Sequence, residues 1–128
     1  MKVVSFIARI LLGLMFFVAG LNGFLNFMHA PLPPGLAGTF LSALVASRFV
    51  YFISGVQLIA GALLLVNRFV PLALALLAPV LYNILAFHIT MQPSGLPPGL
   101  VASILWLILV WRLRAFFAPL LVQKAFEK

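Results

Sequence analysis

The sequence predicts an all-α integral membrane protein: a four-helix bundle with a short interfacial helix in its first outer loop, forming one domain over residues 1–128. Of the 128 residues, 66% are hydrophobic and 7% are charged, and the mean hydropathy is +1.29. A soluble domain is typically ~25% charged, because it has a surface to hydrate. Segments of about ten residues that alternate polar and apolar side chains, which indicate a membrane β-barrel, do not occur.

The first predicted span covers about residues 6–27, since roughly 20 apolar residues cross the hydrocarbon core. Because its apolar part is long enough to span, we expect this run to stay in the protein rather than to be cleaved as a signal peptide. Arg9 lies in its first turns, close enough to the interface to snorkel. Asn22 and Asn26 lie near its far end, four residues apart and so on one helical face.

A proline-rich segment, residues 28–47, separates the first span from the second. Within it, residues 37–44 are apolar but too short to cross a bilayer, so they predict a brief interfacial helix. The second span follows at about residues 49–66 and carries Gln57 close to its middle.

The third predicted span covers about residues 69–90 and contains two prolines. Pro71 lies in the first turn, where a missing N–H costs no helical hydrogen bond. Pro79 is internal; it removes one backbone hydrogen bond and predicts a bend just before Asn83. His88 follows near the end of the span.

The fourth span is expected at about residues 100–114, extended at its inner end by snorkelling Arg112 and Arg114. The remaining tail, residues 115–128, mixes Phe and Leu with terminal charges. Such a composition suits a segment that lies on the membrane surface.

The net charge of +7 comes from single basic residues at the ends of apolar runs. This pattern predicts orientation, not nucleic-acid binding. Arg48 alone falls on one side of the predicted membrane, and the positive-inside rule therefore places both termini in the cytoplasm. The basic residues on the cytoplasmic side are Lys2, Arg9, Arg68, Arg112, Arg114, Lys124 and Lys128.

Two smaller patterns bear on the architecture. The pentapeptide LPPGL occurs at residues 32–36 and again at 96–100. This repeat is consistent with two parallel helical hairpins related by an axis along the membrane normal. The alternative is a chance recurrence of Pro-Gly turns. Small residues that we expect where helices approach closely are Gly13, Gly20, Gly55, Ala60, Gly61 and Ala62.

Five polar residues from three helices share the outer side of the predicted bundle: Asn22, Asn26, Gln57, Asn83 and His88. In one interpretation they hydrogen-bond between helices and hold the bundle, each worth about 0.6–2 kcal/mol. In the other they line a pocket for a neutral, flat, weakly polar molecule, such as a quinone or a lipid. The aromatic walls expected for that pocket are Phe24, Phe27, Tyr82 and Phe87.

The composition offers no catalytic set and no metal site. There are no cysteines, and the one acidic residue, Glu127, lies in the tail. No serine therefore has a carboxylate nearby to orient a base. A haem held by two histidines would need His29 as the partner of His88, and His29 lies in a loop. The lack of charge within the membrane disfavours solute transport, and no intrinsic cofactor is expected.

Several short segments, in this order and spacing, resemble the DoxX-like family of bacterial membrane proteins. They are RILLG at 9–13, GLNGF at 20–24, GALLL at 61–65, RFVPLA at 68–73 and NILAFH at 83–88. The resemblance implies a four-helix protein of the bacterial inner membrane, and named members of the family are linked to thiosulfate:quinone oxidoreduction and to oxidative-stress complexes. Many members carry a glutamate in the second span, where this chain has Gln57. If that glutamate transfers protons, this chain lacks the step.

Two functions follow from these observations. The first is a redox-linked, quinone-associated membrane subunit without its own metal. The alternative is a structural accessory subunit that packs on a larger membrane complex and performs no chemistry. The expected partners are membrane lipids and either other membrane subunits or further copies of this chain; nucleic acid is not expected.

Overall fold

The structure is a computed structural model that describes residues 2–126, and this part of the chain is all-helical. Three helices in this range are long and apolar enough to cross a membrane, and a fourth span results if α2 and α3, which are bent by 83° at their junction, count as one. The elements in chain order are α1 (Lys2–Leu25), α2 (Gly35–Ala46), α3 (Val50–Val66), α4 (Val70–Thr90), η1 (Pro93–Gly95), α5 (Leu96–Arg112), α6 (Arg114–Phe117) and η2 (Ala118–Leu121).

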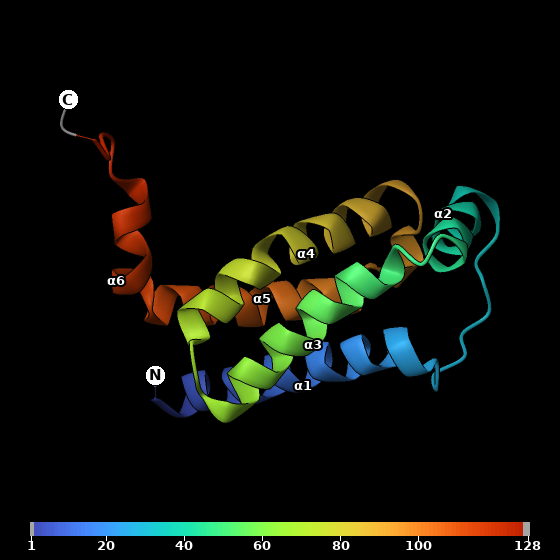
Figure 1. Ribbon diagram of the computed structural model, residues 1–128. Coiled ribbons are helices and arrows are strands. Elements are labelled where there is room, and N and C mark those ends of the chain that lie inside the picture. Colours follow the sequence, from blue (N-terminus) through green and yellow to red (C-terminus); the bar gives the residue numbers. More distant parts are fainter. Residues whose placement is uncertain (1, 127–128) are drawn as a thin grey trace.

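The four longer helices pack side by side in a closed order. α1 contacts α3 and α5, and α4 contacts the same two helices. Figure 1 shows α2 across one end of these helices and α6 leaving the opposite end at a steep angle, on the same side as the N-terminal end of α1. We refer to these two sides as the α2 end and the α6 end.

Glycines bring α1 and α3 into backbone contact. A Cβ atom on Gly20 would lie 2.7 Å from Leu58 Cα, and one on Gly61 would lie 2.8 Å from Phe17 Cα. Helices approach this closely only where side chains are absent. Gly55 differs, because its nearest neighbour would be the edge of the Phe24 ring at 4.0 Å. The expectation of close approach is confirmed at Gly20 and Gly61 and is wrong at Gly55.

Two long-range side-chain hydrogen bonds reinforce this packing. Arg9 Nη1 donates to the carbonyl oxygen of Leu64 at the C-terminal end of α3. Trp106 Nε1 on α5 donates to the carbonyl oxygen of Leu74 on α4, with an N···O distance of 2.8 Å. The fully buried leucines at the centre come from three helices and are Leu12, Leu64, Leu74 and Leu77.

Two helices begin earlier than the sequence predicts. α1 begins at Lys2 rather than near residue 6, and α5 begins at Leu96 rather than near residue 100. In α5 the reason is local: Pro97 and Pro98 lie in the first turn, where the N–H groups have no helical partner in any case. The predicted fourth span is also interrupted near its end, because α5 stops at Arg112 and α6 begins after it.

A helix also occupies the loop after α1. α2 covers Gly35–Ala46, somewhat longer than the predicted 37–44. Gly35 has φ +74°, a backbone conformation that glycine adopts without the steric cost of a Cβ. The two LPPGL segments thus differ in their surroundings: the first leads into α2 across the end of the molecule, and the second opens α5 alongside the other helices (Figure 1).

The C-terminal segment turns away from the helix array after Leu113. α6 and η2 leave several apolar side chains exposed, among them Phe116, Leu120 and Leu121. The predicted surface tail reaches residue 128, and its last two residues lie outside the described part of the chain.

Candidate functional site

A groove of about 1100 Å³ opens at the α2 end of the molecule, between α1, α2, α3 and α4. The first half of α3 and the second half of α4 form its two long walls. Four of the five predicted polar residues line it: Asn22, Gln57, Asn83 and His88. The fifth, Asn26, lies outside the groove and is exposed.

The two asparagines of the first helix terminate α1. The side-chain Oδ1 of Asn22 accepts the backbone N–H of Met28, at 2.7 Å. Asn26 has φ 52° and donates its own backbone N–H to the carbonyl of Asn22, also at 2.7 Å. An asparagine just past a helix end commonly takes this left-handed conformation. Asn26 is therefore engaged in ending the helix, and Asn22 contributes to both the turn and the groove.

Asn83 and His88 both line the groove although they lie five residues apart on α4. Asn83 Nδ2 donates to the carbonyl oxygen of Pro79, one turn earlier, at 2.8 Å. His88 Nδ1 lies 3.2 Å from the carbonyl oxygen of Gln92. Each side chain thus bonds to the backbone close to it in sequence, and the groove separates it from α3.

Gln57 faces them from α3. Within residues 2–126 its side-chain amide has no hydrogen-bond partner in the protein, so both its donor and its acceptor are free. Ser54, one turn earlier on the same face, also lines the groove while being only 2% exposed. Its hydroxyl packs directly against Gly23 of α1. The one signal for Ser54 in the sequence is its spacing of three residues from Gln57.

The aromatic walls differ from those expected. Of the predicted set, only Phe87 lines the groove. Phe24 stacks on Tyr51 instead, with ring centroids 5.4 Å apart, and Tyr82 is 75% exposed. The other aromatic walls come from α2 and the start of α3, and these are Phe40, Phe49 and Phe52. The expectation failed because it did not anticipate that α2 would cover the groove.

The ring of Phe40 on α2 meets the ring of Phe87 on α4, with centroids 5.5 Å apart. This contact joins α2 to α4 through two residues that both line the groove. Aromatic pairs at this distance are favourable in tilted arrangements. α2 therefore supplies one wall through Phe40, followed by Leu41 and Leu44.

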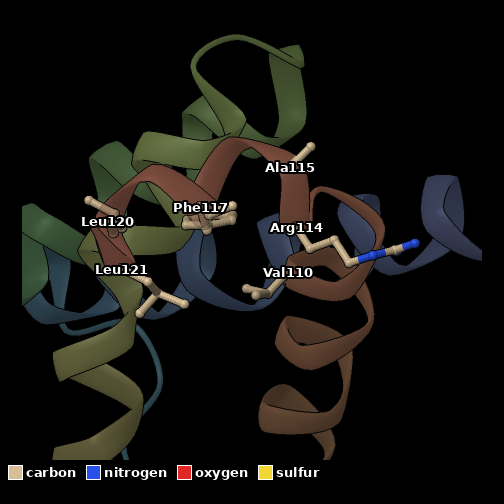
Figure 2. Close-up of a pocket in the computed structure, with 7 residues that line it drawn as sticks. Val110, Arg114, Ala115, Phe117, Leu120 and Leu121 are labelled. Carbon is tan, nitrogen blue, oxygen red and sulfur yellow. The ribbon is translucent and has the colours of Figure 1, made fainter. Parts of the chain in front are cut away.

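A second hollow, of about 610 Å³, lies at the α6 end between the end of α5, α6 and η2. Figure 2 shows Val110 pointing toward Phe117 and Leu121, while Arg114 extends the opposite way. The Arg114 guanidinium lies 4.3 Å from the centre of the Trp111 ring and donates to the Trp111 carbonyl at 2.9 Å. Apart from Arg114, whose guanidinium is engaged by Trp111, the residues that line this hollow are apolar, so it offers few hydrogen-bonding groups to orient a ligand.

The long apolar helices place the chain among multi-pass helical membrane proteins. The family model of DoxX matches residues 4–90, which is more than half of the chain. The protein belongs to the DoxX family, as the resemblance in sequence indicated. The match runs from α1 through α4 and includes every groove residue except Met91 and Gln92. Comparisons with curated proteins and with solved structures find no match.

Proposed function

We propose that this DoxX-family protein is a four-span subunit of the bacterial inner membrane that binds a neutral, flat, weakly polar molecule, such as a quinone, and serves a redox-linked role without a metal of its own. One observation carries the proposal: Asn22, Gln57, Asn83 and His88 line a single groove, and no side-chain hydrogen bond joins any two of them. Polar groups placed in an apolar helix region without pairing to one another favour a ligand.

The chemistry of the groove supports a neutral ligand. Its walls contain amides, hydroxyls, an imidazole and four phenylalanines, and no Asp, Glu, Lys or Arg. An ion would find no opposite charge there, whereas a ring with a few polar substituents would find apolar surfaces and a small number of hydrogen-bonding groups. The volume of about 1100 Å³ is ample for one ring with part of an isoprenoid or acyl chain.

The residue at position 57 limits the chemistry that the subunit performs. An amide does not exchange protons as a carboxylate does, so Gln57 binds a ligand without relaying its protons. His88 is the one imidazole in the groove, and its ring nitrogens can form hydrogen bonds with a ligand. Electron carriers would then come from other membrane subunits, which makes such subunits the expected partners, together with lipids or further copies of this chain.

The distribution of basic residues supports an orientation with both termini in the cytoplasm. Arg48 belongs to the α2 end, and elements at the α6 end carry the other basic residues of the described chain (Figure 1): Lys2, Arg9, Arg68, Arg112, Arg114 and Lys124. By the positive-inside rule the α6 end faces the cytoplasm. The groove then opens in the outer leaflet.

Photolabelling tests the proposed ligand. An azido-quinone added to the full chain in lipid nanodiscs should label the walls formed by α3 and α4, and excess unlabelled quinone should suppress the label. Ala86→Trp would fill the groove, because Ala86 lines it, and should lower labelling at least tenfold. Ile89→Trp is the matched control, since Ile89 is exposed on the same helix but does not line the groove. If the Ala86→Trp variant is labelled as strongly as the wild type, the proposal is contradicted.

An accessory subunit without chemistry is the second candidate. A stripe of exposed apolar residues along α5 favours it: Val101, Ile104, Leu107 and Trp111 recur every three or four residues and so lie on one face. In this case the protein should co-purify in mild detergent with a larger membrane complex and retain that association when the groove is filled by Ala86→Trp. A stable, isolated chain would argue against this second function.

A further inference from the structure

The hydrogen-bonding groups of α4 that remain free in the groove are all acceptors. Asn83 shows this first. Its amide contacts the carbonyl oxygen of Pro79, and a carbonyl can only accept, so the contacting atom must be the NH₂ group. The side-chain oxygen of Asn83 is the atom left for a ligand.

His88 follows the same logic. Its Nδ1 lies 3.2 Å from the carbonyl oxygen of Gln92, which again has no proton to give. In the neutral ring, Nδ1 therefore carries the hydrogen, and Nε2 keeps its lone pair. The ring is held in place because it packs against Gly95, where an added Cβ would lie 2.7 Å from its Cε1 atom. His88, which lines the groove, thus keeps a free acceptor at Nε2.

Pro79 creates a third acceptor. Proline has no N–H, so the carbonyl of Ala75, four residues earlier, loses the donor that a regular helix would supply. Ala75, Pro79 and Asn83 all line the groove and are exposed there. Along the helix axis the Ala75 carbonyl lies about 6 Å before the Pro79 carbonyl, at 1.5 Å per residue. The side-chain amide of Asn83 binds at the Pro79 carbonyl. The Ala75 carbonyl and the side-chain oxygen of Asn83 are therefore two acceptors about one helical turn apart.

We propose that the groove selects a neutral ring bearing hydroxyl groups, the reduced form of a quinone, whose O–H groups donate to the acceptors of α4. The inference rests on the proposed function, in which the groove binds a neutral flat molecule. An oxidised quinone has only carbonyl acceptors, which would face the acceptors of α4 unpaired, and an unpaired buried polar group is costly. Gln57 and Ser54 on α3 can donate or accept, so the α4 wall decides between the two forms.

A ring fits the aromatic walls better than a hydroxylated acyl glycerol does. The rings of Phe40 and Phe87 have a centroid separation of 5.5 Å, and both residues line the groove. A flat ligand can stack on these faces while its hydroxyls reach α4. A diacylglycerol would offer a hydroxyl donor but no ring.

Equilibrium binding to the full chain in nanodiscs, under anaerobic conditions, tests the selection with four probes. These are a short-chain ubiquinol, the matching ubiquinone, the dimethyl ether of the quinol, and dioleoylglycerol. We expect the quinol to bind about tenfold more tightly than the quinone or the ether, since each hydrogen bond with a good partner is worth roughly a threefold to tenfold change in affinity. Tighter binding of dioleoylglycerol than of the quinol would overturn the assignment of a ring.

Pro79→Ala is the decisive variant, because it restores the N–H that pairs with the Ala75 carbonyl. Quinol affinity should fall about threefold to tenfold while quinone affinity stays unchanged. Pro71→Ala is the matched control: Pro71 lies in the first turn of the same helix and outside the groove, so both affinities should stay as in the wild type.

The binding results distinguish selection of the quinol by α4 from the proposed function, the binding of a neutral flat molecule in the groove. Equal affinity for quinol and quinone, or a Pro79→Ala variant that keeps the full preference for the quinol, would overturn the selection by α4 and leave the groove as a quinone site. Failure of both quinol and quinone to bind the wild-type chain would overturn the proposed function itself. Because alanine is a better helix former than proline, Pro79→Ala should fold.

Discussion

Arg9 Nη1 on α1 donates to the carbonyl oxygen of Leu64 in the last turn of α3, and a longer contact of 3.3 Å reaches the carbonyl of Leu65. The Leu64 carbonyl also accepts the backbone N–H of Asn67 at 3.3 Å, so Arg9 adds a charged donor at the C-terminal end of α3, where the negative end of the helix dipole favours a cation. Arg9 is half-buried here. It therefore caps a neighbouring helix, a role beyond the snorkelling that its place in the sequence predicts.

The first prediction follows from this cap. Arg9→Met keeps most of the side-chain length and removes the donor, so it should lower the stability of the protein by about 1.5–3 kcal/mol, the usual range for hydrogen bonds to charged groups. Arg9→Lys should retain part of that stability, because its ammonium can still donate. The midpoint of thermal unfolding in detergent measures both. A wild-type midpoint for Arg9→Met would contradict the capping role.

The second prediction uses two glycines with different surroundings. Gly20→Ala places a methyl group 2.7 Å from Leu58 Cα, and backbone cannot move aside as a side chain can. We expect a loss of about 1–3 kcal/mol from overpacking. At Gly55 an added Cβ would meet only the edge of the Phe24 ring at 4.0 Å, an ordinary van der Waals contact, so Gly55→Ala should gain about 0.5–1 kcal/mol from helix propensity. If both variants unfold at the same temperature, the α1–α3 contact is looser than the structure has it.

The sequence predicts the helices of this protein well and their contacts less well. Apolar length and proline positions give the limits of α3 and α4 to within a residue. The same two criteria place the start of α5 about four residues too late, because Pro97 and Pro98 are typical of a loop and yet also suit the first turn of a helix. Hydropathy also carries no information on which helix α2 covers, so the contribution of Phe40 to the groove could not be foreseen.

The sequence also does not predict which polar side chains form hydrogen bonds between helices. In the described chain, no side chain among Asn22, Asn26, Gln57, Asn83 and His88 donates to another helix, and the hydrogen bonds that they do form are to backbone close in sequence. Arg9 and Trp106 make the long-range bonds instead. Residue type alone does not distinguish the two sets, because a polar side chain in an apolar helix finds its own backbone as readily as a neighbour's.

The third prediction compares one residue from each set. Asn83→Leu removes a bond within α4 at an exposed position, and its stability should stay within about 0.5 kcal/mol of the wild type. Trp106→Phe removes the bond between α5 and the Leu74 carbonyl and should cost about 1–3 kcal/mol. Thermal unfolding in detergent again provides the measurement. A larger loss for Asn83→Leu than for Trp106→Phe would show that Asn83 holds the helices together after all.

The fourth prediction concerns topology. A reporter fused after Lys128 should be active only in the cytoplasm, and one inserted at Ser94, in η1 at the α2 end, only outside. The positive-inside rule supplies the reason, because within residues 2–126 Arg48 is the one Lys or Arg at that end. Termini on opposite sides of the membrane would contradict the four-span arrangement.

The fifth prediction tests whether α2 forms a wall of the binding site. Phe40→Ala removes the ring that meets Phe87 across the groove, so quinol affinity should fall about tenfold, the loss expected for one aromatic contact and its buried area. The midpoint of thermal unfolding should change little, because Phe40 is 41% exposed and α2 makes few contacts with the other helices. Val45→Ala on the same helix is the control: Val45 is exposed and does not line the groove, so its affinity should match the wild type. If Phe40→Ala and Val45→Ala bind the quinol with equal affinity, the ligand lies between α3 and α4, and α2 is not part of its site.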